Sequence, residues 1–225
     1  MRIWIFIVCL FFPLLQPAAQ PEYKPPGDKV IRVGLNFGAN VSNFLADDPF
    51  YKDIYNWRFR FYAAVFQDIR IAPPFYLHTE VNYSAMGTMQ KVFVTDFNGD
   101  TLGRGSFKYN LHYIQVPVLG KFKFGQKLKF TCEAGPYIGF LVAAKGGIDP
   151  DFSTSFVYPL YNLIDTYYTM DVGVKAGVGM EIPTLNGQIL LIGARYTQGF
   201  IDVSKVAPRD WNAGIGFHLG YMFEL

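Results

Sequence analysis

The chain has 225 residues, of which 51% are hydrophobic, 18% aromatic and only 17% charged. The aromatic content excludes an intrinsically disordered protein, because disordered chains contain few aromatic residues. The formal net charge of +2 is too small to indicate a nucleic-acid-binding protein, which would carry a strongly basic surface.

The first 20 residues have the pattern of a signal peptide for Sec-type export. Arg2 supplies a positive charge, residues 3–15 form an apolar segment, and small residues at 17–20 form a cleavage region. The apolar segment is shorter than the roughly 20 residues that a transmembrane helix needs, so we expect cleavage rather than anchoring. Residues 21–30 are proline-rich and are predicted to form an extended periplasmic leader, which leaves 31–225 as the folded domain.

Beyond residue 30 the dominant pattern is an alternation of apolar and polar residues, with the period of two that is typical of β-strands. The clearest instance is MDVGVKAGVGMEI, residues 170–182, where Met, Val, Ala and Ile alternate with Asp, Lys, Glu and Gly. The alternation predicts eight strands, at about 32–40, 57–66, 74–84, 109–124, 128–144, 166–182, 188–198 and 211–223.

The connections between these strands alternate between long and short. The long ones are 41–56, 85–108, 145–165 and 199–210, and the short ones are 67–73, 125–127 and 183–187. An even number of strands with short turns at one end and long loops at the other is typical of outer-membrane barrels. We therefore predict an all-β fold, an eight-stranded antiparallel up-and-down transmembrane β-barrel in the outer membrane, with four surface loops and both termini in the periplasm.

A soluble β-sandwich is the alternative fold. Its polar faces would meet water and would be rich in Lys, Glu, Thr and Ser, whereas the polar positions here are rich in glycine. Glycine weakens a strand and therefore needs a reason. The interior of an eight-stranded barrel is only just filled by side chains, so glycines would leave room for long Arg, Lys and Tyr side chains. This favours the barrel, with its apolar face toward lipid.

Three stretches resemble a known family: PFYLHTEVNYSAMG (74–87), HYIQVPVLGKFKF (112–124) and EAGPYIGFLVAAKG (133–146). They are similar to the PorT-like, or "porin family", outer-membrane β-barrel proteins, and the likeness covers about residues 30–225. The resemblance implies an eight-stranded barrel that the barrel assembly machinery inserts from the periplasm. Through the PorT name it also implies an accessory role in a protein secretion machine, but it implies little about activity.

The charged residues on the inward positions form the best-defined candidate site. In a narrow lumen they are expected to pair, because an unpaired buried charge costs several kcal/mol. We therefore expect a polar lumen filled by side chains and a structural or accessory role. The alternative is a narrow pore for small solutes, which the excess of bases would make selective for anions. The residues are the bases Arg58, Arg60, Lys121, Lys123, Lys129, Lys175 and Arg195 and the acids Glu80, Glu133, Asp171 and Glu181.

Catalytic and metal-binding motifs are missing from the sequence. It has neither a Gly-x-Ser-x-Gly elbow nor a His-Glu-x-x-His motif. Of the three histidines, we expect His78 and His218 in the lumen and His112 near the outer rim. Residues 96–100 (DFNGD) resemble the start of a calcium loop, but the glycine comes two positions early, so we expect a turn. No enzyme activity and no cofactor are expected. The expected partners are outer-membrane lipid, lipopolysaccharide, and a surface or secretion-machine protein.

Overall fold

The computed structural model describes residues 31–95, 98–150, 160–184, 187–206 and 209–224. The predicted signal peptide (1–20) and leader (21–30) lie outside the described residues. No helix in this part of the chain combines the length and the apolarity needed to cross a membrane. The elements are β1 (Ile31–Ala46), α2 (Pro49–Ile54), β2 (Tyr55–Asn56), β3 (Arg58–Ala72), β4 (Phe75–Met86), β5 (Met89–Thr95), β6 (Thr101–Phe124), β7 (Lys129–Pro150), β8 (Tyr161–Asn162), the 3₁₀ helix η2 (Ile164–Thr166), β9 (Met170–Pro183), β10 (Ile189–Gly199) and β11 (Asp210–Glu224).

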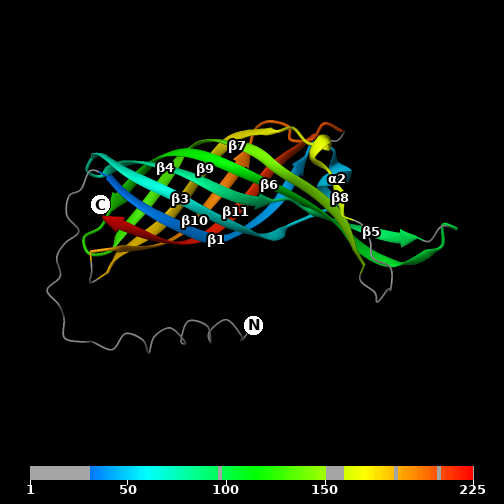
Figure 1. Ribbon diagram of the computed structural model, residues 1–225, viewed down its shortest axis with the longest axis horizontal. Helices are drawn as coiled ribbons and strands as arrows, with labels where there is room; N and C mark the ends of the chain where they lie inside the picture. Colours follow the sequence, from blue (N-terminus) through cyan, green and yellow to red (C-terminus); the bar gives the residue numbers. More distant parts are fainter. Residues whose placement is uncertain (1–30, 96–97, 151–159, 185–186, 207–208, 225) are drawn as a thin grey trace, which may run out of the picture.

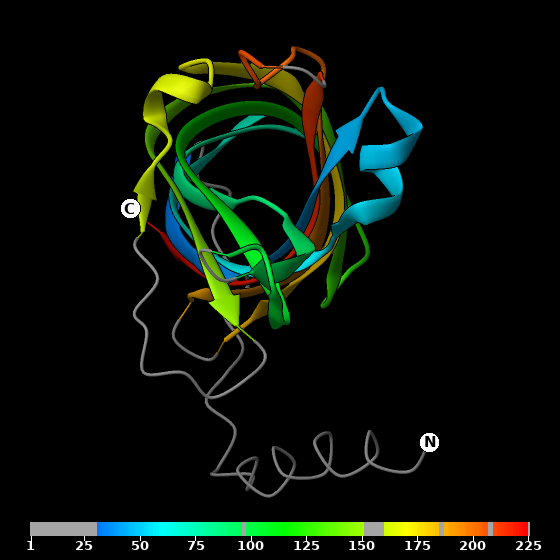
Figure 2. The ribbon, with the colours of Figure 1, turned by 90° about the vertical axis from the view of Figure 1, so that its right-hand side faces the viewer.

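Eight long strands close into a ring, which Figure 2 shows almost end-on. Their order is β1-β3-β4-β6-β7-β9-β10-β11, every pairing is antiparallel, and β11 pairs back with β1. Ring neighbours are also consecutive long strands in the chain, which confirms the predicted eight-stranded up-and-down barrel. The short strands β2, β5 and β8 lie outside this ring. They gather at the end we call the loop end, and the short connections lie at the opposite turn end (Figure 1).

The wall has its apolar side chains on the outside. In β9, Met170 and Val178 are exposed, whereas Asp171 and Lys175 on the alternate positions are buried. In a soluble protein the apolar side chains of an alternating strand would be buried. Because they are exposed here, the pattern excludes the soluble β-sandwich and requires that the outer face of the wall meets an apolar environment. Exposed aromatic residues mark both edges of the apolar surface, as in a membrane barrel. They are Phe122, Phe124, Phe130, Tyr221 and Phe223 at the turn end and Trp57, Phe59, Phe140 and Tyr196 toward the loop end.

The first short connection is tighter than the sequence predicts. Residues 67–73 were expected to form a turn, but β3 continues to Ala72 and only Pro73 and Pro74 separate it from β4. The period-two pattern explains the difference, because Asp68 is buried on the lumen side while Ile71 is exposed on the outside. The longer strand brings Asp68 into the barrel.

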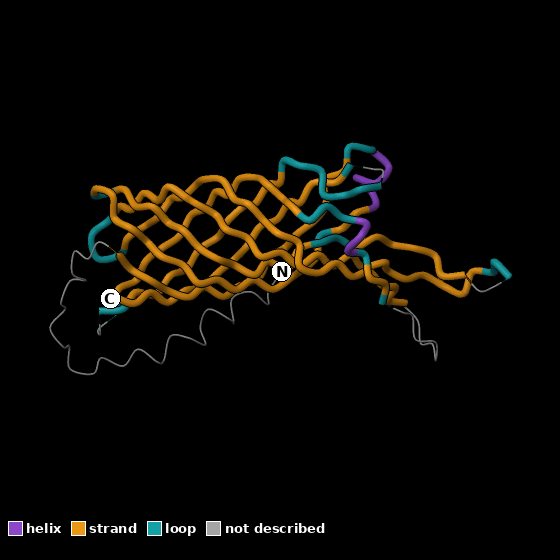
Figure 3. The backbone as a smooth tube through the Cα atoms, turned by 45° about the horizontal axis from the view of Figure 1, so that its top comes forward, coloured by secondary structure: helices purple, strands orange, loops and turns teal. Residues whose placement is uncertain are grey.

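The second long connection is also different from the prediction. Much of the expected loop 85–108 is an antiparallel hairpin in which β5 pairs with the first part of β6. The outer part of β7 pairs with the same part of β6, from Gly105 onward. The three strands extend well beyond the ring at the loop end (Figure 3). Segment 89–95 (MQKVFVT) contains the β-branched and aromatic residues that favour strands. The expected turn at 96–100 lies partly outside the described residues.

Candidate functional site

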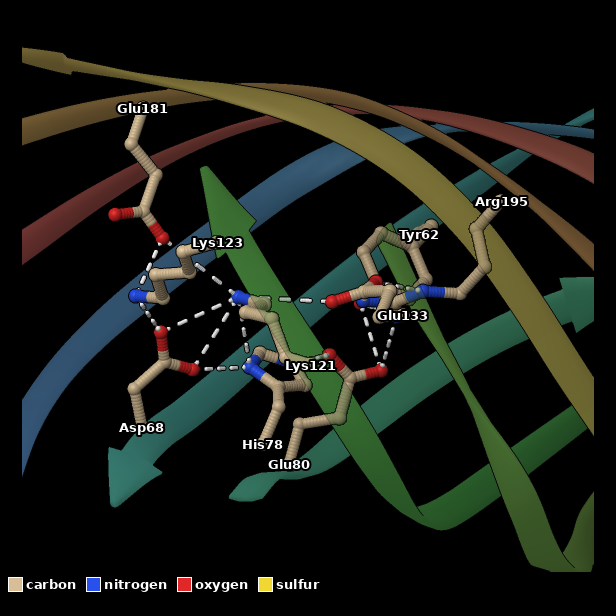
Figure 4. A network of polar contacts seen from close by, with 9 residues as sticks. All are labelled: Tyr62, Asp68, His78, Glu80, Lys121, Lys123, Glu133, Glu181 and Arg195. Carbon is tan, nitrogen blue, oxygen red and sulfur yellow. Dashed lines mark hydrogen bonds and ion pairs between the residues drawn. The ribbon is translucent and has the colours of Figure 1, made fainter. Parts of the chain in front are cut away.

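A network of polar side chains crosses the lumen between six of the eight ring strands (Figure 4). None of its nine residues is more than 8% exposed. Because opposite walls of the barrel are connected through these side chains, the network braces the ring from inside. We call it the lumen network, and its members are Tyr62, Asp68, His78, Glu80, Lys121, Lys123, Glu133, Glu181 and Arg195.

Arg195 of β10 holds the half of the network nearer the loop end. Its Nε and Nη2 donate to Oε1 of Glu133 on β7, at 2.8 and 2.5 Å. Its Nη1 donates to Oε1 of Glu80 on β4, at 2.9 Å. The same Glu80 oxygen accepts from the Tyr62 hydroxyl (2.9 Å) and from Nδ2 of Asn82 (2.8 Å). One guanidinium therefore joins three strands, and hydrogen bonds to a charged group are the stronger ones in proteins.

A glycine makes this arrangement sterically possible. Gly177 of β9 is the register partner of both Glu133 on β7 and Arg195 on β10, so it lies directly between them. A Cβ atom at Gly177 would lie 2.9 Å from the carbonyl oxygen of Ala194 and 3.3 Å from the side chain of Arg195. The glycine therefore leaves the space across which the arginine reaches the glutamate, as the crowded-lumen argument predicts.

Asp68 holds the half of the network nearer the turn end. Its carboxylate accepts from Lys123 at 2.7 Å and from Lys121 at 3.3 Å, and its Oδ1 lies 2.6 Å from Nδ1 of His78. Lys123 also forms an ion pair with Glu181, at 2.6 Å, without the alignment of a hydrogen bond. The other ring nitrogen of His78 lies 3.2 Å from Glu80, so His78 connects the two halves.

Two further charged residues of the predicted set are buried but separate from the network. Lys175 donates to Oε1 of Gln115 at 2.8 Å. Asp171 accepts from the Tyr137 hydroxyl and from Nδ2 of Asn212, both at 2.9 Å. These contacts fill the part of the lumen closer to the loop end.

The structure places Arg58, Arg60 and Lys129 apart from the other predicted lumen charges. Arg58 donates to the carbonyl of Tyr109 and to Oδ1 of Asn110. None of these three basic residues forms an ion pair in the described part of the chain. For the two arginines, the position along β3 explains the separation from the other lumen charges. The pairing of β3 with β4 ends at Tyr62, so the preceding arginines lie above the closed part of the ring. Lys129 is the first residue of β7 and is only half-buried at the turn end.

The remaining space in the charged part of the lumen is small. One cavity of about 20 Å³ is lined by His78, Glu133 and Arg195, and another of about 10 Å³ by Tyr62 and Lys175, among others. His218 contributes to both. A water molecule needs a cavity of roughly 10–15 Å³, so each space holds about one water. Neither can admit a solute.

The loop end of the lumen is closed by an apolar cluster that we call the outer plug. Strand ends and loops both contribute to it, and the Phe44 and Tyr55 rings meet edge-on at 5.9 Å. The sequence does not predict this cluster, because its loop members have no periodic pattern. The plug consists of Phe44, Tyr55, Met86, Leu111, Tyr113, Leu141, Ala144, Tyr167 and Val203.

Asp210, the first residue of β11, borders the plug. It lies outside the apolar surface of the wall, because the exposed apolar residues of β11 begin at Ile215. The Tyr55 hydroxyl donates to Oδ2 of Asp210 at 3.4 Å, and Oδ1 of Asp210 is buried without a hydrogen-bond partner. Burial and, next, the charge of Asp202 raise the pKa of Asp210 to about 7. Burial and the neighbouring Asp210 raise the pKa of Tyr55. One carboxyl group at the border of the plug therefore has a pKa near neutral pH.

An open cleft of about 860 Å³ lies outside the ring between the segments around Asp47 and Asp202. Two of its acidic residues accept hydrogen bonds from backbone N–H groups of these segments. Asp47 accepts from the backbone N–H of Arg209, and Asp202 accepts from those of Ser204 and Asp210. Among the described residues, no three His, Cys, Asp or Glu side chains are grouped as ligands of a metal ion.

One family model agrees with the architecture. The family model "Outer membrane protein beta-barrel domain" matches residues 18–205, more than three quarters of the chain. No curated protein matches the sequence. Similar solved structures include Neisserial surface protein A (13% identity, 88% of this chain and 99% of that one, TM-score 0.47). Others are OprG of Pseudomonas aeruginosa (10%, 90% and 100%, 0.45) and Ail of Yersinia pestis bound to a heparin analogue (12%, 87% and 100%, 0.41).

Proposed function

The chain belongs to the outer membrane protein β-barrel domain family, and we propose that within the outer membrane it acts as a closed barrel of structural or accessory type. The observation that carries the proposal is the filled lumen, where a buried network joins six strands and the two cavities beside the network have volumes of only about 20 and 10 Å³. We propose no catalytic role, because the charged groups of the lumen bind one another.

Planar-bilayer recording tests the closed barrel. We expect the purified, folded protein to give no steady single-channel current, because side chains occupy the lumen of an eight-stranded barrel. A large general porin inserted in the same bilayers serves as the positive control. Steady openings that prefer anions would instead support the small-solute pore.

The sheet extension at the loop end supports an accessory role, in line with the resemblance to PorT-like proteins. β5 forms one edge of this extension and pairs with β2 only at Met89 and Gln90. Beyond these two residues its outer edge has no strand partner in the described part of the chain. An exposed edge can add a strand from another protein. We propose a surface protein or a component of a secretion machine as the partner.

These roles require the loop end to face the outside of the cell after Sec-type export and insertion by the barrel assembly machinery. Short turns of outer-membrane barrels face the periplasm, which would place both termini there. A cysteine introduced at Lys91, exposed on β5, should react with a membrane-impermeant maleimide on intact cells. A cysteine at Gln126 in the opposite turn should react only after lysis. The reverse labelling pattern would contradict this orientation.

A further inference from the structure

The outer edge of β5 is an open sheet edge in the part of the protein that extends beyond the ring (Figure 3). β5 pairs with β6 along its whole length, whereas on its other side it pairs with β2 only at Met89 and Gln90. Residues 91–95 therefore have no strand partner on that side in the described part of the chain. Their sequence, KVFVT, contains no proline, so the edge keeps all of its backbone N–H groups.

The ladder between β5 and β6 shows which backbone groups this edge presents. The N–H of Tyr109 donates to the carbonyl of Thr88, directly before β5, at 2.9 Å. Hydrogen-bonded pairs alternate along an antiparallel ladder. Counting from Thr88, Lys91 and Phe93 fall on positions whose N–H and C=O groups point away from β6. The open edge therefore offers two donors and two acceptors with the spacing that an added strand requires.

The face of the sheet beside this edge is apolar at its centre and positive around it. Phe93 is 69% exposed, and the guanidinium of Arg104, its register partner on β6, lies 5.8 Å from the centre of the ring. Lys91 is also exposed. Neither cation has an ion-pair partner among the described residues, whereas Lys108 of the same face pairs with Asp149. A strand added at this edge would meet one apolar side chain flanked by two unpaired positive charges.

We propose that the β5 edge binds an extended acidic segment of a partner protein, which joins the sheet as a further strand. Backbone hydrogen bonds supply affinity in this mode of recognition, and alternate side chains supply specificity. An apolar residue of the segment would lie against Phe93 and a carboxylate against Lys91, since opposite charges on neighbouring strands stabilise a sheet. The inference rests on the accessory role proposed above and names the chemistry of its partner.

The charges argue against a second copy of this chain as the added strand. Two β5 edges paired with each other would bring two Lys91 and two Arg104 side chains to one face of the joined sheet. The described part of that face offers no free acid to balance them, and like charges across a sheet repel. A segment that carries glutamate or aspartate on alternate positions removes this repulsion.

Binding is tested with the folded protein in phosphatidylcholine nanodiscs and the peptide Thr-Glu-Thr-Val-Thr-Glu-Thr, followed by isothermal calorimetry. The control peptide has lysine in place of both glutamates and should bind about tenfold more weakly, because attraction becomes repulsion. Methylating the backbone nitrogens of Val and Glu in the acidic peptide should abolish binding, because these face β5. Methylating those of the two central Thr residues, which face away, should change binding by less than about twofold.

Charge exchange on the protein tests the assigned residues. Lys91→Glu should bring the affinities for the two peptides to within about twofold, and Lys91→Glu with Arg104→Glu should reverse the preference. Lys127→Glu, an exposed lysine at the turn end, is the matched control and should leave the preference unchanged. Equal binding of both peptides by the wild type, or no binding of the acidic peptide at about 1 mM, would overturn the proposal.

Two further outcomes separate this inference from others. A dimer of the wild-type protein that Phe93→Asp dissociates, seen by native mass spectrometry, would overturn the acidic segment in favour of a second copy. The peptide assay does not depend on the orientation of the barrel. If maleimide labelling placed β5 in the periplasm while binding still depended on Lys91, the surface role would be refuted and the strand-addition site would stand.

Discussion

Arg195→Met is expected to lower the free energy of unfolding by about 3–5 kcal/mol, the usual cost of removing one partner from a buried ion pair. The substitution leaves the carboxylates of Glu80 and Glu133 buried at a point where both now accept hydrogen bonds from the guanidinium. Urea unfolding in lipid vesicles, followed by the fluorescence of Trp57 and Trp211, measures the change.

Two companion variants separate the ion pair from a general effect of losing a cation. Lys129→Met removes an inward-facing base without an ion pair in the described chain and should cost less than about 0.5 kcal/mol. Arg195→Met with Glu133→Gln should cost less than the sum of the single changes, because the residues interact directly. If the two changes simply add, the contact between Arg195 and Glu133 does not stabilise the barrel.

The barrel itself was predictable because lipid restricts the wall more strictly than water does. Every outward position must be apolar, so period-two alternation persists along β9, and glycine on the inward positions distinguishes a crowded lumen from a solvated face. The same rule, followed two residues beyond the predicted strand end at 66, would have found Asp68. The connection is tighter than predicted, because only Pro73 and Pro74 separate β3 from β4.

Other features depend on contacts that alternation does not encode. Arg58 and Arg60 have the inward parity, but the sequence does not show that the pairing of β3 with β4 ends at Tyr62. The outer plug joins Tyr55, Tyr167 and other residues from separate loops. Such residues have no common period, and only the closed ring brings them together.

Leu219→Arg is expected to lower the free energy of unfolding by about 2–4 kcal/mol, the cost of an arginine on the lipid face near the middle of the membrane. Leu219 is 59% exposed and lies midway along the exposed apolar set of β11, between Phe37 of β1 and Ile192 of β10 in the register. Phe223→Arg, at the turn end of the same strand, is the matched control and should cost about 0–1 kcal/mol. Unfolding in vesicles measures both.

The comparison with Arg195 shows why the position of the charge decides its effect. An arginine in the lumen stabilises the barrel because Glu80 and Glu133 are already placed to accept its hydrogen bonds. At Leu219 the register neighbours are Phe37 and Ile192, which offer no acceptor side chain, and the surrounding lipid offers none at that depth. If Leu219→Arg unfolded like the wild type, β11 would not face lipid there, and the assignment of inner and outer positions along the strand would be wrong.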